Sequence, residues 1–451
     1  MSKVKPAILP AYVFLCLLIG GSTQGIWAKA MLQVLAIAII GWAILTREPQ
    51  FVPVAAKRLL WIAGGIGLLF AIQLVPLPPA AWTTLPGRGL IASGFDLLGM
   101  QLPWQPLSIA PYDTGVAALT LLPPLAVLVG MVRLRAWTIS GMLAAILLAA
   151  VMSVLLGVLQ VTGGDGSWYF YRITNRGVAV GAFANGNHFA TLLLASIPLL
   201  AGIAVSEWRA AAAGSQRRSL SAALSIAAAA VFVVGILING SAAIFLLGPP
   251  VALATLLLAQ RPPLKRLRQG LMAIALLLAV AAALLVTVGK DLPGWGTNAS
   301  IETRTEYWAK TAAATKEHGL AGTGFGTFRQ VYRQFEDPGT VNRWYVNHAH
   351  NDYLELALEG GVGAMLLLAL FLFWWAARAR DTWLAPGGTP EQKGAAVASA
   401  VILLHSSFDY PLRTAAMMVL MAACLAILAG ARGAIRVDRA DGRPKARHAT
   451  L

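Results

Sequence analysis

The stretch "NHAHNDYLELALEGGVGA", residues 347–364, joins a polar segment to the start of a long apolar one. It holds two of the chain's six histidines and three of its nineteen acidic residues. Asn351 or Asp352 is placed to cap a helix, because the side chains of Asn and Asp accept hydrogen bonds from the first backbone N–H groups. Asp352, Glu355 and Glu359 then recur at helical spacing and share one face. The stretch predicts a membrane helix with a carboxylate stripe near its outer end.

The composition around this stretch is that of a polytopic membrane protein. Of the 451 residues 58% are hydrophobic and only 12% charged, and the mean hydropathy is +0.69, which excludes an ordinary soluble globular protein. One span takes roughly 20 mostly apolar residues. Twelve segments are candidates: 7–20, 26–45, 59–76, 115–132, 137–161, 188–206, 221–238, 242–259, 270–288, 352–376, 395–408 and 411–430. The predicted fold class is all-α, with about twelve transmembrane helices.

The first and eleventh segments are short, which suits tilted or partly re-entrant helices. The N-terminus has the basic start and apolar middle of a signal peptide, but no small-residue cleavage site follows. We therefore expect the first segment to remain as a membrane helix.

The basic residues behind the net charge of +16 are distributed according to the predicted membrane topology. With both termini inside, 23 of the 35 Lys and Arg residues fall in inner loops or in the tail, as the positive-inside rule requires. We expect cytoplasmic termini, a tail at 431–451 held to the inner leaflet, and the lipid bilayer rather than nucleic acid as the partner of this charge.

This topology divides the chain into spans one to nine (1–288), an outer helical loop (289–351), spans ten to twelve (352–430) and the tail. An earlier outer loop, 77–114, is rich in proline and tryptophan and is predicted to lie at the membrane interface. Within 289–351, "SIETRTEYWAKTAAATKEHG" predicts a helix from a Ser300 cap to Gly319. Arg304, Trp308 and Thr311 would share one of its faces. A glycine-rich break follows, and then a short helix.

The carboxylates invite a structural and a functional interpretation. Glu359 lies roughly 12 Å along the helix from Asn351, deep enough that it should face the bundle interior and find a partner. In the structural interpretation the acids only bind arginines, and the glycines at 360, 361 and 363 let a neighbouring helix approach closely. His350, just above the helix, is a candidate general base, because a neutral imidazole can accept a proton from a hydroxyl.

A metal site is the weaker interpretation of these histidines. His348 and His350 with Asp352 follow the spacing of a zinc hydrolase motif, but the further ligands such a site needs have few candidates. Cys16 and Cys424 both fall inside spans, so neither a disulfide framework nor a metal ligand is expected of them. We expect no metal and no cofactor.

Two more polar clusters lie at predicted span ends. Asn185, Asn187 and His188 open the sixth span, where the amides either cap the helix or meet a substrate. Arg172 and Arg176 precede them and would bind an anionic group or lipid headgroups.

The last cluster, "HSSFDYPLR" at 405–413, contains Asp409 and Arg413. These two form a local ion pair, or else Asp409 orients another arginine while Arg413 reaches the substrate.

Together "HAHNDYLELALEGGVGA", "GAFANGNHFA", "RTEYWAKTAAATKEHGLAGTGFGTF" and "HSSFDYPLR" resemble the O-antigen ligase and O-antigen polymerase superfamily of bacterial inner-membrane glycosyltransferases. The resemblance covers roughly residues 170–430. It implies many spans, cytoplasmic ends, a large periplasmic loop late in the chain and an active site on the periplasmic face.

The resemblance also implies a reaction. The donor would be a glycan on undecaprenyl diphosphate, and the acceptor a hydroxyl of lipid A-core or of a growing polysaccharide, with no metal and usually with inversion. His350 matches the family's base and Arg304 its diphosphate-binding arginine. Arg172, Arg176, Arg413, Asn187 and Asn351 are further candidates for binding the donor or substrate, and His348, Glu355, Glu359 and Asp409 for supporting roles.

One position departs from the family pattern. Ligases of the family often carry an arginine after the seventh span, where this chain has Ala242 in "NGSAAIF". A ligase is therefore the first hypothesis and a repeat-unit polymerase the alternative. A transporter of polyprenyl-linked glycans and an inactive scaffold are further alternatives, although no internal repeat supports transport.

Overall fold

The computed structural model describes residues 5–46, 51–164, 168–212, 214–258, 297–339 and 345–431. Up to residue 258 its helices are η1 (Lys5–Ala7), α1 (Ile8–Ile19), α2 (Ile26–Leu45), α3 (Val54–Leu74), α4 (Pro79–Trp82), α5 (Gly89–Leu97), α6 (Pro111–Leu119), α7 (Leu122–Arg133), α8 (Ile139–Thr162), α9 (Gly186–Ala210), α10 (Gln216–Asn239) and α11 (Ala242–Leu258). From residue 297 they are α13 (Thr297–His318), η4 (Gly319–Ala321), α14 (Phe328–Tyr332), η5 (Arg333–Phe335), α15 (Asp352–Leu384), α16 (Pro390–His405), η6 (Pro411–Arg413) and α17 (Ala415–Leu428). Two short strands, β1 (Pro76–Leu77) and β2 (Gln105–Pro106), pair antiparallel.

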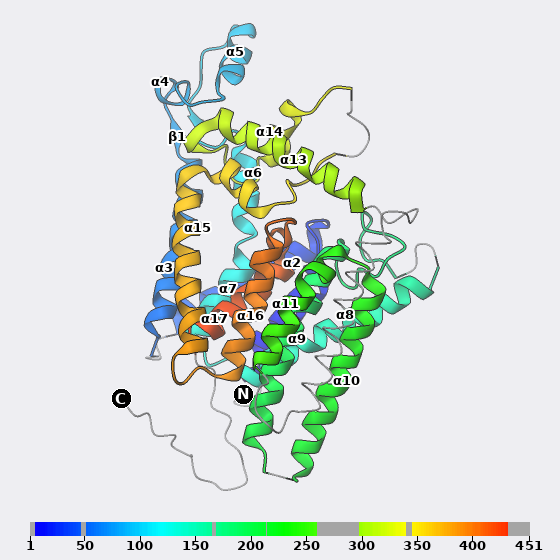
Figure 1. Ribbon diagram of the computed structural model, residues 1–451. Helices are drawn as coiled ribbons and strands as arrows, with labels where there is room; N and C mark the ends of the chain where they lie inside the picture. Colours follow the sequence, from blue (N-terminus) through cyan, green and yellow to red (C-terminus); the bar gives the residue numbers. More distant parts are fainter. Residues whose placement is uncertain are drawn as a thin grey trace.

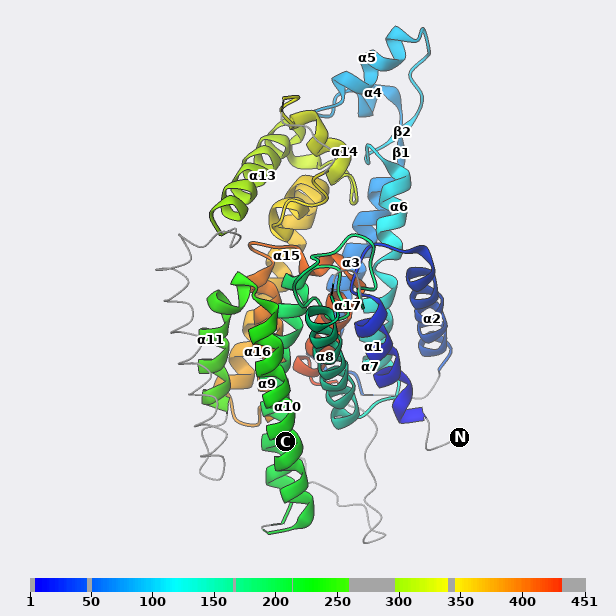
Figure 2. The ribbon, with the colours of Figure 1, turned by 90° about the vertical axis from the view of Figure 1, so that its right-hand side faces the viewer.

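The helices form a bundle that is capped at one end. Figures 1 and 2 show α13 and α14 lying over the end of the bundle opposite to the start of α1, with α4 and α5 further out beyond β1. We call the covered end the outer end. Segment 77–114, predicted to be an interfacial loop, therefore forms the outermost part of the described chain in these views.

The helical membrane architecture is confirmed in its main feature. Seven described helices are long and apolar enough to cross a membrane: Ile26–Leu45, Val54–Leu74, Pro111–Arg133, Ile139–Thr162, Gly186–Ala210, Gln216–Asn239 and Asp352–Leu384. Shorter apolar helices lie at Lys5–Ile19, Ala242–Leu258 and Ala415–Leu428. The predicted count of twelve is not confirmed, because segment 270–288 lies outside the described residues and the eleventh segment forms the 16-residue helix α16.

The centre of the bundle is built from α9, α16 and α17. Nearly all of α17 is buried, and α16 packs along α9. The two cross where Gly202 of α9 meets Pro390 and Gly394 of α16 meets Pro198. A Cβ at either glycine would lie 2.8 or 2.5 Å from the carbonyl oxygen of the facing proline. Small residues at this contact thus bring the two backbones together at the start of α16, as in membrane bundles generally.

The helix α15 is broken near its outer end. Gly361 has φ 57° and ψ −153°, a conformation that is open essentially only to glycine. A Cβ there would lie 2.2 Å from the carbonyl oxygen of Leu320. The prediction that the glycines admit a neighbouring helix holds at Gly363, which faces Leu69 of α3. At Gly361 it is wrong, because the close neighbour is the loop after α13.

That loop is bonded to the broken turn of α15. The carbonyl of Leu358 accepts from Thr323 N (3.0 Å), and that of Glu359 accepts from Gly324 N (2.9 Å) and from Gln73 Nε2 (2.9 Å). Gln73 also accepts from the N–H of Phe325 through Oε1 (2.9 Å). The break thus exposes carbonyls that a helix would use internally, and the glycine-rich loop satisfies them. This contact fixes α13 over the bundle.

Two local predictions about α13 can be compared with the structure. The helix ends at Gly319 (φ 64°) as predicted. It begins at Thr297, so the predicted Ser300 cap is wrong and Ser300 lies inside the first turn.

Candidate active site at the outer end of the bundle

The start of α15 holds His350 in an unusual backbone conformation. Of the two predicted caps, Asn351 and Asp352, the cap is Asn351, which accepts from the N–H groups of Tyr353 and Leu354 through Oδ1 (3.1 and 3.0 Å). His350, just before it, has φ 51°, which is uncommon for a residue other than glycine. Trp308 Nε1 donates to its carbonyl oxygen (3.2 Å). Strain of this kind is retained where the surroundings determine it, and it is frequent at functional sites.

Glu355 fixes the segment just before His350. Its Oε2 accepts from the N–H of Ala349 (2.9 Å), and its Oε1 lies 2.9 Å from His348 Nδ1. A carboxylate can only accept when ionised, so the proton in this contact is on the imidazole. Glu355, one residue of the carboxylate stripe, therefore anchors residues 348 and 349.

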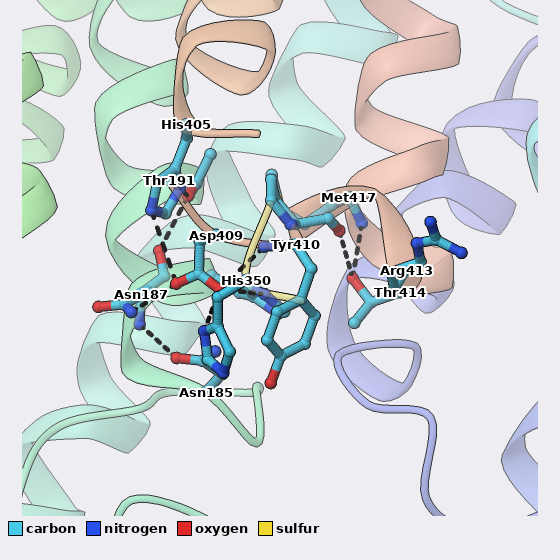
Figure 3. A network of polar contacts seen from close by, with 12 residues as sticks. Asn185, Asn187, Thr191, His350, His405, Asp409, Tyr410, Arg413, Thr414 and Met417 are labelled. Carbon is cyan, nitrogen blue, oxygen red and sulfur yellow. Dashed lines mark hydrogen bonds and ion pairs between the residues drawn. The ribbon is translucent and has the colours of Figure 1, made fainter. Parts of the chain in front are cut away.

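Asp409 is the centre of the site, in the turn that follows α16. It is fully buried. Its Oδ1 lies 3.4 Å from His350 Nδ1, and its Oδ2 lies 3.8 Å from the guanidinium of Arg304. Asn187 Nδ2 of α9 donates to Oδ2 (2.5 Å). Figure 3 shows His350 and Asn187 directed toward this carboxylate. Asp409 thus joins three segments that are far apart in the sequence.

The electrostatics keep Asp409 ionised. Burial alone raises the pKa of a carboxyl group, but the hydrogen bond from His350 and the charges of His405 and His188 outweigh it. The pKa of Asp409 therefore lies well below its usual range. Burial raises the pKa of the neighbouring Tyr410 to about 12, so its phenol stays protonated.

Arg304 and His350 remain partly open although they share a buried partner. The side chain of Arg304 is 23% exposed and that of His350 21% exposed. Arg304 also donates from Nη1 to the carbonyl oxygen of Phe408 (2.9 Å). Arg304 and Trp308 contact the same region, and Thr311 is fully buried, which agrees with the single face predicted for α13. The Nδ1 atom of His350 faces Asp409, so Nε2, on the other side of the ring, points away from it.

The carboxylate stripe binds Arg413. The guanidinium lies 3.2 Å from Asp352 Oδ1, 3.3 Å from Glu355 Oε1 and 2.9 Å from Glu359 Oε2. Burial lowers the pKa of Arg413, but these three carboxylates raise it by more. Glu359 also accepts from the N–H groups of Gly326 (2.9 Å) and Phe328 (3.1 Å). The acids thus tie α15 to the last loop and to the α13–α14 connection.

Of the two interpretations of Asp409, the structure shows the contact with another arginine. Arg413 points away from Asp409 in Figure 3, and Asp409 contacts Arg304 instead. Arg172 and Arg176 lie on the exposed loop before α9, with Arg176 over the ring of Tyr169 at 5.6 Å. Ala242 opens α11 beside Ser241, whose Oγ donates to Asn187 Oδ1 (2.7 Å). The departure from the family pattern thus lies close to the site.

Several residues of the site were not among the predicted site residues. The Tyr410 ring contacts His188, His348 and His350, with ring centroids 5.1, 4.4 and 4.7 Å apart. His188 and His405 are buried beside Asp409, with Nε2 atoms 4.0 and 3.8 Å from its oxygens. Four of the chain's six histidines thus gather around residues 409 and 410. The motif "HSSFDYPLR" contained His405 and Tyr410, but only the packing of α9 against α16 shows that they meet His188.

Within the described ranges no group of three or more His, Cys, Asp or Glu side chains has an arrangement that could hold a metal ion. Cys16 and Cys424 are both buried and free.

The comparison with known families agrees with this geometry. A family model described as O-antigen ligase matches residues 226–369, a stretch that includes Arg304, His350 and the carboxylate stripe, whereas Asp409 lies beyond it. No curated protein matches the chain. Over residues 226–369 the match confirms the resemblance to the O-antigen ligase superfamily found in the sequence.

Proposed function

We propose that this protein transfers a glycan from undecaprenyl diphosphate to an acceptor hydroxyl, with His350 as the general base and Arg304 as the residue that binds the diphosphate. The reaction would take place on the periplasmic face of a bacterial inner membrane, with both termini cytoplasmic. The family match supports a glycosyltransferase or ligase of this class.

The observation that carries the proposal is the carboxylate of Asp409 between His350 and Arg304. It orients a base and a cation from one buried point, and both stay partly exposed. A base is useful only when it is held within reach of the proton it removes, and a departing diphosphate is stabilised by fixed positive charge. The arginine fork also matches phosphate oxygens.

The proposed step balances as a single displacement. The acceptor hydroxyl gives its proton to His350 Nε2 while its oxygen forms the new bond to the anomeric carbon. The bond from that carbon to the diphosphate oxygen breaks, and undecaprenyl diphosphate leaves with the electron pair. Attack from the face opposite the leaving group inverts the anomeric centre.

The remaining candidate site residues differ in their surroundings. Arg172 and Arg176 are exposed and can approach a diphosphate. Asn187 and Asn351 lie beside the base and can contact sugar hydroxyls. Arg413 faces three carboxylates, so we assign it to the framework, together with Glu355 and Glu359.

The acceptor distinguishes two members of this class. Transfer to lipid A-core is the ligase reaction and our first hypothesis, and transfer to another lipid-linked unit is polymerisation of O-antigen or exopolysaccharide. Both use the same base and donor site.

A complementation experiment tests the proposal. The gene is deleted and restored as wild type, His350→Ala or Arg304→Ala at matched membrane levels, and envelope polysaccharide is separated on a gel. We expect both variants to lose polymer and to accumulate lipid-linked glycan. Core without polymer indicates lost ligation, and core with one unit indicates lost polymerisation.

Arg333→Ala is the matched control, because Arg333 is an exposed outer arginine outside this cluster. Wild-type polymer from His350→Ala and Arg304→Ala would contradict the transferase assignment and favour transport or a scaffold role.

A further inference from the structure

Beside the row formed by Arg304, Asp409 and His350, the site contains a second row of arginine, carboxylate and histidine. Asp409 joins Arg304 to His350, and Glu355 joins Arg413 to His348, with distances of 3.3 Å to the guanidinium and 2.9 Å to the imidazole. Both imidazoles present Nδ1 to the carboxylate. The His348 side chain is 17% exposed, close to the 21% of His350.

The Tyr410 ring places the two histidines against one side chain. Its centroid lies 4.4 Å from that of His348 and 4.7 Å from that of His350. The hydroxyl of Tyr410 accepts from Asn347 Nδ2 (3.2 Å), which holds the start of the same segment. A ligand at Nε2 of one imidazole is therefore near the other.

The two rows of side chains differ in formal charge. Around His350, Asp409 and Arg304 sum to zero. Around His348, the three carboxylates of the stripe and one arginine sum to −2. A nearby charge of opposite sign favours a charged group, and environments that separate two titratable groups assign the acid and the base. The two imidazoles therefore lie in different electrostatic surroundings, His350 beside a neutral pair and His348 beside a group with net negative charge.

We propose that His348 is a second substrate-contacting residue, which donates a hydrogen bond from Nε2 to the diphosphate of the donor. This inference rests on the proposed function and deepens it. His350 takes the proton of the acceptor hydroxyl, while His348 stabilises the charge that develops on the leaving diphosphate without transferring its own proton. The carboxylate of Glu355 keeps the ring oriented, as partners of catalytic histidines commonly do.

The groups that face His348 come from four elements. They are Glu355 of α15, with Asp352 and Glu359 behind it, Tyr410 and Arg413 of the α16–α17 connection, Phe328 of α14 and His188 of α9. Of these, Arg413 is already shared by the three carboxylates.

Binding of undecaprenyl diphosphate to the purified full-length protein tests this role without turnover. We expect His348→Gln to weaken binding about tenfold or more, the effect of losing a hydrogen bond to a charged group. His350→Gln keeps this contact and should lose less affinity than His348→Gln.

Two further variants keep the test decisive. His318→Gln is the matched histidine control, because His318 lies at the far end of α13 against Gly87, and it should bind like wild type. Glu355→Gln keeps the ring of His348 but removes the carboxylate that orients it, so binding should weaken. Thermal unfolding of each variant reports folding separately.

The outcomes separate the two proposals. If wild type binds the diphosphate and His348→Gln binds equally well, His348 does not contact the donor. If wild type does not bind the diphosphate at all, the proposed transferase function itself fails.

Discussion

The clusters around Asp409 and Arg413 lie four residues apart in one loop and have opposite compositions. In the first, a single buried carboxylate meets an arginine and three histidines, of which Arg304 and His350 remain partly exposed. In the second, a single arginine meets three carboxylates and joins α15 to the last loop. An arginine that contacts one carboxylate keeps positive charge available to a ligand, whereas an arginine shared among three carboxylates has none to spare. The comparison separates reactive from structural charge.

The largest expected effect is on stability, when Arg413 and Arg304 are each replaced in turn. Arg413→Met leaves three buried carboxylates without their cation, and breaking a buried ion pair costs about 3–5 kcal/mol. Arg304→Met removes the arginine from a single carboxylate that His350 and Asn187 also contact, and should cost less stability. Unfolding in detergent measures the difference. Equal losses in the two variants would mean that the clusters do not differ as described.

His350→Gln should show the reverse pattern. Removing a general base lowers a rate by about 10²–10⁴-fold, while a partly exposed imidazole contributes little to folding. Transfer activity in membranes and the unfolding temperature, measured together, check this. A variant that unfolds like Arg413→Met would place His350 in the framework instead.

A smaller effect is expected from a substitution at the break in α15, where the loop that positions α13 is bonded. Gly361→Ala places a Cβ 2.2 Å from a carbonyl oxygen in a backbone region that costs about 1–3 kcal/mol for other residues. Gly363→Ala is the control, because its Cβ would lie 3.2 Å from the movable side chain of Leu69. We expect only Gly361→Ala to lower both stability and transfer, since it displaces the loop that positions α13. Similar unfolding temperatures for the two variants would argue against this.

The smallest expected effect concerns pH. The pKa of Asp409 is depressed in the folded state, so its contribution to stability is present above the unfolded pKa of about 3.9 and is lost only as the pH falls through the folded value. The stability difference between wild type and Asp409→Asn should therefore be no smaller at pH 5 than at pH 8. A difference that declines over this interval would show that the carboxyl titrates there and is not held by its cations.

The sequence determined the features that depend on local pattern. Apolar segments of spanning length, the Asn351 cap, the shared face of the acids and the glycine-terminated helix of the outer loop all follow from residues close together in the chain. The family motifs added the candidates His350 and Arg304, and the family match agrees with the resemblance.

Only the tertiary structure decided how these parts are connected. Whether Asp409 pairs with Arg413 or with Arg304 depends on packing between α13, α15 and the α16–α17 connection, and residue spacing carries no information about it. Gly361 could be recognised as a glycine near a helix end, but its conformation follows from the loop of residues 320–324 that bonds to the broken turn. His188, His405 and Tyr410 become neighbours because α16 packs along α9, with His405 against Thr191. The physical reason is that burial and ion pairing are set by contacts between distant segments, whereas helix formation and capping are set within a few residues.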